Sequence, residues 1–218
     1  MCDCEDSNCQ IKSIQFGIYS PEDLIKRSVC HVNSNKMSGP NSVYDENMGT
    51  IENNKNCVRC GQNNKHCPGH FGHIVLNYNI IHPLYFKMVV AFLKCFCIKC
   101  SKILISEDKL KLNGILKYSG EARFNKIIDL IEKVEICPCC NNIQPKYMYV
   151  STESIIYMIF KRKQEQIKTP LLENEILNIF ENISESDVRL LGMNPESILP
   201  KNLILQVLPV IPPVARPY

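Results

Sequence analysis

Four side chains that bind soft metal ions lie close together in the first third of the chain. Two Cys-x2 pairs separated by six residues supply them, in the order Cys57, Cys60, Cys67 and His70. A tetrahedral zinc ion needs four such donors at about 2.0–2.3 Å, and a two-residue gap lets both members of a pair reach one ion. Pro68-Gly69 favours a tight turn inside the second pair. The motif therefore predicts a structural zinc site, and His66 and His73 are poorer ligands because neither forms a two-residue gap with Cys67.

Two further Cys-x2-Cys pairs, separated by 36 residues, form a second candidate zinc site. The predicted ligands are Cys97, Cys100, Cys137 and Cys140. Cys95 and Cys139 lie beside them, and each could replace a neighbouring ligand. Only the four predicted ligands, however, give the two-residue spacing twice. A redox-active pair is the alternative, yet a thioredoxin-type site needs a βαβ context that the sequence does not show. We therefore predict a second zinc ion, at the base of a helical hairpin formed between the pairs.

The cysteine content bears on the compartment as well. Thirteen of the 218 residues are cysteine, but residues 1–6 lack the basic and apolar segments of a secretion signal. The sequence contains no run of 18 apolar residues, so we expect no transmembrane helix. Because disulfide frameworks need an oxidising compartment, we expect a protein that is not secreted and whose clustered cysteines bind metal.

Basic residues are concentrated in one stretch of the chain. The formal net charge is only +3, and seven thiolates with two zinc ions would bring it to about 0. Between residues 84 and 126, however, there are nine Lys and Arg residues but only three Asp and Glu residues. A solvated helix face is the simpler interpretation of any single lysine, but together these residues could contact phosphates. The candidate nucleic-acid contacts are Lys94, Lys99, Lys102, Lys109, Lys111 and Arg123, with a second group at Lys161, Arg162 and Lys163.

Periodicity and capping signals predict an α+β fold in which helices dominate, with irregular loops. Residues 1–10 are interpreted as a flexible arm and residues 31–56 as an irregular loop. Helices are expected over residues 21–28, 83–97, 107–117, 121–134 and 173–182, with a short one between Ser184 and Gly192. Residues 147–159 fit a strand or a helix, and residues 207–213 fit an extended segment. No nucleophile triad, phosphate-binding glycine loop or close carboxylate pair is evident, so no catalytic residue is predicted.

Several segments, in order, resemble the N-terminal region of the largest subunit of eukaryotic and archaeal-type DNA-directed RNA polymerases. Residues 57–74 resemble the first zinc motif of that family, and residues 97–100 with 140–145 resemble parts of its second zinc site. Further similarities lie at residues 14–22, 44–51, 175–180 and 207–217. The resemblance covers residues 11–218 and is therefore more specific than either cysteine motif alone.

The resemblance implies a role in DNA-templated transcription. In this family the region forms a mobile clamp that closes over DNA and the RNA–DNA hybrid, and two zinc ions maintain its shape. It implies a clamp region over residues 11–218, with the first zinc site at 57–73, the hairpin and second site at 97–140, and the end of the clamp core at 146–218. The implied partners are the second-largest subunit, the other polymerase subunits, DNA and the RNA–DNA hybrid. No association with a membrane is implied.

The sequence also departs from the family. The catalytic Asn-Ala-Asp-Phe-Asp-Gly-Asp loop is absent, so we expect a fragment, split-gene product or first exon of a nucleotidyltransferase. Such a chain would be inactive alone, and Mg²⁺ would bind only in the complete polymerase. Cys2, Cys4 and Cys9 have no family counterpart. The abundance of Ile, Asn and Lys suggests an AT-rich genome, such as that of a large DNA virus or a protist. The expected location is the nucleus, or the host cytoplasm or virion for a virus.

A free-standing zinc-binding interaction module is the alternative function. A RING-like ligase interleaves its ligand pairs, whereas here the first site closes before the second begins. A sequence-specific transcription factor would need a recognition helix with polar side chains aimed at bases. The helix expected after His82 is instead apolar, with Tyr85, Phe86 and Val89 near its start. Both forms of the alternative are therefore disfavoured.

Overall fold

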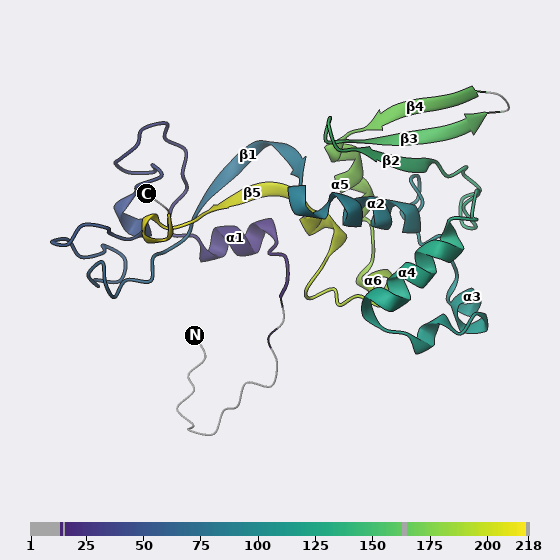
Figure 1. Cartoon of the computed structure of the whole chain (residues 1–218), viewed down its shortest axis with the longest axis horizontal. Coiled ribbons are helices and arrows are strands. Elements are labelled where there is room, and N and C mark those ends of the chain that lie inside the picture. The colour runs from purple at the N-terminus through teal and green to yellow at the C-terminus, as the bar shows by residue number, and fades with distance from the viewer. Residues whose placement is uncertain (1–13, 15, 163–164, 217–218) are drawn as a thin grey trace, which may run out of the picture.

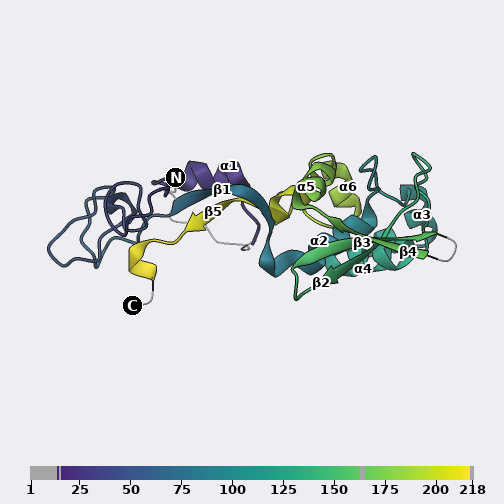
Figure 2. The ribbon, with the colours of Figure 1, turned by 90° about the horizontal axis from the view of Figure 1, so that it is seen from above.

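The computed structural model describes residues 14, 16–162 and 165–216 of the chain. The predicted arm at residues 1–10, with Cys2, Cys4 and Cys9, lies outside the described residues, and so does Lys163. The molecule is elongated and has three parts (Figures 1 and 2). We call them the loop region (residues 29–71), the ribbon (β1 and β5) and the body (residues 82–203).

Six α-helices and five strands lie in the described part of the chain. The helices are α1 (Pro21–Arg27), α2 (Phe86–Cys95), α3 (Glu107–Leu112), α4 (Gly120–Ile131), α5 (Glu173–Glu181) and α6 (Glu185–Leu190). The strands are β1 (Gly72–Ile81), β2 (Lys146–Val150), β3 (Ile155–Arg162), β4 (Glu165–Leu171) and β5 (Ile204–Val210). Short 3-10 helices occur at Glu46–Met48, Pro83–Tyr85, Ile115–Lys117, Pro200–Leu203 and Pro213–Ala215.

The ribbon connects the loop region to the body. Strands β1 and β5 are antiparallel, with Gly72 opposite Val210 at one end and Ile81 opposite Ile204 at the other. The chain therefore leaves the ribbon at Ile81, forms the whole body and returns at Ile204. Helix α1 lies beside the ribbon (Figure 1). Its first turn is capped by Ser20, whose hydroxyl accepts a hydrogen bond from the Asp23 backbone N–H at 3.1 Å.

The body contains the main hydrophobic core. Buried faces of α2, α4 and α5 meet around Phe92, whose ring centroid lies 5.3 Å from that of Phe124 and 6.2 Å from that of Phe180. Each such side chain stabilises the fold by roughly 1.5–3 kcal/mol through burial. Strand β2 covers α2, and Phe86 stacks on Tyr149 with ring centroids 4.4 Å apart. The core thus fixes the C-terminal ends of α2 and α4. The Cys97–Cys100 pair follows α2, and the Cys137–Cys140 pair follows α4.

The mixed α and β composition is confirmed, but the dominance of helices is not. Residues 147–159, which fitted either state, form β2 and most of β3 in a three-stranded sheet of order β2-β3-β4. Two strands were not predicted. Strand β4 contains Pro170, which normally argues against a strand, but β4 is an edge strand where a missing N–H is tolerated. Strand β1 was missed although it is rich in β-branched residues between Gly72 and Pro83.

Candidate metal centres

The three Cys-x2-Cys turns at residues 57–60, 97–100 and 137–140, which we call knuckles, share one backbone pattern. The first cysteine donates its N–H to the carbonyl five residues later, at 2.8–2.9 Å, and accepts from the N–H four residues later, at 2.8–3.0 Å. The residue after the second cysteine has a positive φ, which Gly and Asn adopt most readily. These residues are Gly61 (71°), Ser101 (53°) and Asn141 (54°). The turn points both thiols of each knuckle to the same side.

The turn from Cys67 to His70 depends on a close approach by the C-terminal segment. Gly69 has φ 78°, and its N–H lies 3.4 Å from the Cys67 Sγ. A Cβ at Gly69 would lie 2.5 Å from the Pro212 Cβ, so only glycine fits. On the other side, the His70 N–H donates to the Met48 carbonyl at 3.0 Å. Segments far apart in sequence therefore hold this turn in place.

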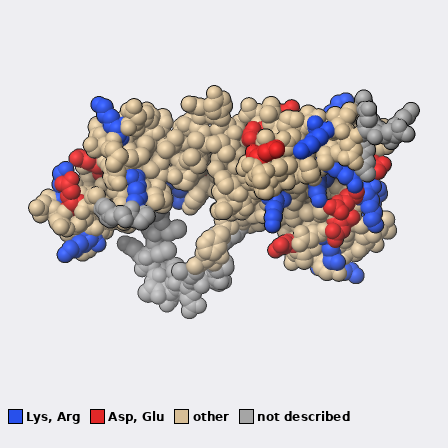
Figure 3. All heavy atoms as spheres, turned by 45° about the horizontal axis from the view of Figure 1, so that its top comes forward, with Lys and Arg blue, Asp and Glu red and all other residues tan. Residues whose placement is uncertain are grey.

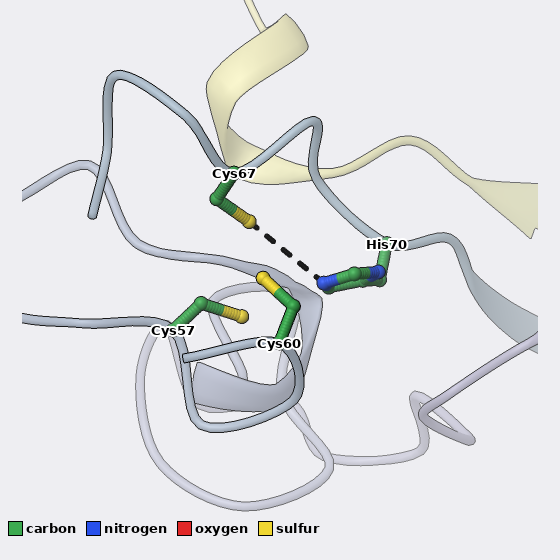
Figure 4. Close-up of side chains that lie close together, drawn as sticks. All are labelled: Cys57, Cys60, Cys67 and His70. Atoms are coloured by element: carbon green, nitrogen blue, oxygen red, sulfur yellow. Dashed lines mark hydrogen bonds between the residues drawn. The ribbon is translucent and has the colours of Figure 1, made fainter. Parts of the chain in front are cut away.

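The first cluster, defined as Cys57, Cys60, Cys67 and His70, has the geometry of a four-ligand metal site. All four ligand atoms lie within 4.8 Å of one another, and they converge from two turns (Figure 4). A tetrahedron with metal–sulfur bonds of about 2.3 Å has ligand–ligand edges of about 3.5–3.8 Å. The Cys67 Sγ lies 3.8 Å from the His70 Nε2, which fits that size. The residues present can therefore hold one ion.

The second cluster consists of Cys97, Cys100, Cys137 and Cys140. The Cys97 and Cys140 sulfurs are 3.5 Å apart, and those of Cys100 and Cys137 are 3.7 Å apart. These distances again match tetrahedral edges. The 97 knuckle follows α2 and the 137 knuckle follows α4, so an ion here would join the ends of two helices that pack together. Helix α3, the 3-10 turn at Ile115–Lys117 and α4 occupy the segment in which a helical hairpin was expected.

The thiols of each cluster differ in acidity. Burial raises the pKa of Cys97, but backbone N–H groups of Cys100 and Lys99 outweigh it and lower the pKa to about 7. Burial raises the pKa of Cys100 to about 12. In the first cluster the pKa of Cys57 is lowered, because N–H donors outweigh burial, whereas burial raises that of Cys67 to about 11. In each cluster the thiol with the lowered pKa, Cys97 or Cys57, is therefore more readily deprotonated than Cys100 or Cys67, and the charge of a bound metal ion would displace the remaining protons.

Two cysteines that could have replaced a ligand lie outside the clusters. Cys95 is fully buried in the core, and burial raises its pKa to about 12. Cys139 is exposed and belongs to neither group of converging ligand atoms in the described residues. Sequence reasoning missed Gln144, whose side-chain amide contacts the Cys97 sulfur at 3.3 Å. Its position four residues after the 137 knuckle carries no recognised ligand signal, so spacing alone could not identify it.

The predicted nucleic-acid contacts fall into two groups. We call a side chain engaged if it already forms an ion pair or hydrogen bond within the chain, and unengaged if it does not. Lys94 pairs with Glu132 and Lys111 with Glu107, both at 2.9 Å. The Arg123 guanidinium donates to backbone carbonyls, including that of Tyr118 at 2.7 Å. Three other lysines of the predicted set are exposed and form no ion pair with any described residue; they are Lys99, Lys102 and Lys109. Lys161 and Arg162 lie at the end of β3.

Charges on the visible face are unevenly distributed. Figure 3 shows Lys, Arg, Asp and Glu interspersed over the body, whereas the surface over the ribbon carries few charges. None of the helices in the described residues has the length and apolar character needed to cross a membrane.

Comparisons with known proteins indicate the family of this chain. The family model "RNA polymerase Rpb1, domain 1" matches residues 8–218. The chain is 38% identical over 226 residues to a probable DNA-directed RNA polymerase II subunit RPB1 homolog of Invertebrate iridescent virus 6. It is 32% identical to both the DNA-directed RNA polymerase III subunit RPC1 of Plasmodium falciparum and the subunit Rpo1N of Sulfolobus acidocaldarius.

These alignments cover nearly all of this chain but a small part of each relative. They include 96%, 96% and 95% of the chain and 22%, 10% and 24% of the viral, Plasmodium and Sulfolobus proteins, respectively. The chain therefore spans less than a quarter of the length of each of these three relatives. Taken with the ordered motifs and the two converging ligand sets, the matches establish that the chain belongs to the RNA polymerase Rpb1 domain 1 family, the N-terminal region of the largest RNA polymerase subunit.

Proposed function

We propose that this chain is the N-terminal part of the clamp of a DNA-directed RNA polymerase, and that it closes over DNA and the RNA–DNA hybrid during transcription. The observation that carries the proposal is the family match over residues 8–218, which includes both cysteine clusters. The elongated form supports it, because a narrow two-stranded ribbon between two larger parts suits an arm that reaches across a cleft (Figure 2).

Both clusters would hold structural zinc. Thiolate and imidazole donors in tetrahedral sets suit Zn²⁺, and four protein ligands leave no open position for water or substrate. When bound, the ion supplies folding energy and not a reaction step. The cysteines would fix the relative positions of α2 and α4 in the body, and of the loop region against residues 212–214. No catalytic residue is assigned to this chain, and Mg²⁺ would be held elsewhere in the complete enzyme.

The nucleic-acid contacts would come from the unengaged lysines of the body. Lys99 lies inside the 97 knuckle and Lys102 two residues after it, and both are exposed. An ion in the second cluster would therefore hold two cations in a fixed position at one end of the body. Their contacts with phosphates would be independent of sequence and sensitive to salt. The engaged side chains, Lys94, Lys111 and Arg123, would contribute less because their donors already have partners.

Assembly provides the first test. The tagged chain, co-expressed with the other polymerase subunits of its source, should recover the second-largest subunit and contain two zinc ions per chain. Recovery of a ubiquitin-conjugating enzyme in place of polymerase subunits would support a RING-like module and contradict the clamp. One zinc ion or none, by elemental analysis of the purified chain, would contradict the proposed metal sites. Cellular fractionation would then distinguish nuclear from viral cytoplasmic assembly.

Binding to DNA provides the second test. In the assembled polymerase, the double change Lys99→Glu and Lys102→Glu should weaken duplex binding for all sequences alike. The slope of log affinity against log salt should fall by about 2, one for each phosphate contact removed. Lys201→Glu is a matched control, because Lys201 is exposed but lies outside the predicted contact set. Equal losses in the double variant and the control would contradict a specific role for the 97 knuckle, and a footprint at one sequence would favour a transcription factor.

A further inference from the structure

The second cluster joins two knuckles that are far apart in sequence, and one side chain bridges them. Gln144 belongs to the strand-like continuation of the 137 knuckle, where its N–H donates to the Glu135 carbonyl at 2.9 Å. Its side chain reaches the other knuckle: Oε1 accepts from the Ile98 N–H at 3.2 Å, and Nε2 lies 3.3 Å from the Cys97 Sγ. Nε2 also donates to the Asn142 carbonyl at 2.9 Å.

These three partners determine the orientation of the amide. The Ile98 N–H can only donate, so it must face the Gln144 oxygen. The Asn142 carbonyl and a Cys97 thiolate can only accept, so both must face the NH₂ group. The reversed amide would place an oxygen against a carbonyl and a sulfur anion. All three contacts are therefore satisfied together in one orientation, and the Gln144 NH₂ group uses both hydrogens.

Cys97 is the ligand with the most hydrogen-bond donors around it. Its sulfur lies 3.4 Å from the Lys99 N–H and 3.3 Å from the Gln144 amide, and the residue has no exposed surface. In the described residues, no other side-chain amide contacts a cluster sulfur, and the Sγ of Cys67 in the first cluster is paired with a backbone donor, Gly69. Each such donor stabilises a buried thiolate, and a donor that bonds to a metal-bound sulfur orients the ligand and adjusts its electron density.

We propose that Gln144 is a positioning residue of the second metal site: its amide locks the 97 knuckle to the 137 knuckle and donates a hydrogen bond to the metal-bound Cys97 thiolate. The inference rests on the proposed metal occupation of this cluster. It assigns the residue a role that a ligand list omits. Without the amide, no side-chain hydrogen bond among the described residues would join the 97 knuckle to the 137 knuckle except through the cluster sulfurs themselves.

The test compares the full chain with Q144L, Q144E and Q166L. Leucine removes the amide at similar volume, and glutamate keeps the shape but cannot donate. Gln166 is exposed on β4, so Q166L controls for loss of an amide remote from the clusters. Competition with a chromophoric chelator should show the second zinc ion bound about 10–100-fold more weakly in Q144L, with the first ion unchanged. Q144E should lose more, because a carboxylate would face the thiolate.

A spectroscopic readout separates electronic from purely structural effects. In the cobalt-substituted chain, the sulfur-to-cobalt charge-transfer bands of Q144L should move to lower energy, because a thiolate without its hydrogen bond is a better electron donor. Unchanged bands and unchanged affinity, or equal weakening of both ions, would overturn the inference. Q144E tests the same bond without a change of shape, so a failure of Q144L to fold leaves the inference decidable. A wild-type chain lacking the second ion would overturn the metal proposal as well, whereas two ions with an unaltered Q144L would overturn this inference alone.

Discussion

The two cysteine clusters use the same knuckle but rest on very different supports. Cys97 and Cys137 have no exposed surface and lie against the main core of the body. The first cluster lies among loops, next to a small group of buried residues formed by Cys30, Val32 and Met48. A knuckle needs only local hydrogen bonds and one positive φ, so the same motif can form on either support. What holds the surroundings in place must therefore differ between the two clusters.

The difference in support teaches what each metal ion would contribute. In the body, hydrophobic burial already brings α2 and α4 together, and the ion adds a link between their ends. In the loop region, regular structure in the described residues is limited to the 3-10 turn at Glu46–Met48. So small an apolar cluster cannot offset the conformational entropy of about forty residues. We expect the first ion to stabilise folding of its region and the second ion to stabilise a region that is already folded.

The largest expected effect is loss of the first ion through His70→Ala. Structural zinc contributes roughly 10–16 kcal/mol to the folding of small domains. Amide hydrogen exchange should therefore rise throughout residues 31–71, while α2 and α4 remain protected. Cys100→Ser, which removes a ligand of the second cluster, should instead raise exchange mainly at the two knuckles. Retained protection of the loop region in His70→Ala would contradict the proposed difference between the clusters.

The next effect distinguishes neighbouring cysteines within the 137 knuckle. Cys140→Ser should reduce the zinc content from two ions to one, because serine is a poor zinc ligand at neutral pH. Cys139→Ser is the matched control: Cys139 is exposed and outside the cluster, so zinc content and melting temperature should not change. Elemental analysis and thermal unfolding of both variants would check this. A loss of zinc in Cys139→Ser with retention in Cys140→Ser would mean that the ligands are exchanged.

Much of this comparison was accessible from sequence, because knuckles are local. The eight predicted ligand residues converge in the two sets that the spacing indicated. Helix starts were also predictable where caps are local, as at Ser20 and Ser184. The structure resolves the choice among neighbours in space: Cys95 points into the core, and Cys139 faces solvent. Which ions fill the clusters stays a prediction.

The features that sequence could not give depend on distant segments. Strand β1 pairs with β5 across more than a hundred residues, so no local pattern announced its partner. The role of Gln144 depends on Ile98 and Cys97, which precede it by more than forty residues. The engagement of Arg123 with carbonyls, in place of an exposed position for phosphates, likewise depends on how α4 meets the preceding turn. Such contacts follow from packing and not from composition.

A smaller effect separates two glycines near the first cluster. Gly69→Ala would place a methyl group 2.5 Å from the Pro212 Cβ and 2.8 Å from the Val214 Cγ2, at φ 78°. We expect a loss of about 3 kcal/mol, from left-handed strain of about 1–2 kcal/mol and from the collision. Gly61→Ala, at φ 71° with nothing within 4 Å of the new Cβ, should lose only the strain. Urea unfolding at saturating zinc would measure both, and equal losses would show that the segment after β5 does not support this cluster.

The smallest expected effect concerns pH and the support beneath the first cluster. The rings of His73 and His31 are stacked with centroids 4.9 Å apart, and the His73 Nδ1 lies 2.8 Å from the Ser28 Oγ. Burial, with a smaller contribution from the charge of His31, lowers the pKa of His73 in the folded chain. The unfolded chain, with an ordinary pKa of about 6.5, then binds more protons, so folding stability should fall as pH drops through that value.

His73→Asn tests this sign, because the amide can still bond to the Ser28 hydroxyl but does not titrate. Its free energy of unfolding should depend less on pH between about 7.5 and 6 than that of the wild type, a range kept above strong protonation of zinc-bound thiolates. The matched control is His66→Asn, since His66 is exposed in the same loop region. An identical pH dependence in His73→Asn and the wild type would show that this pair of rings does not link proton binding to the stability of the loop region.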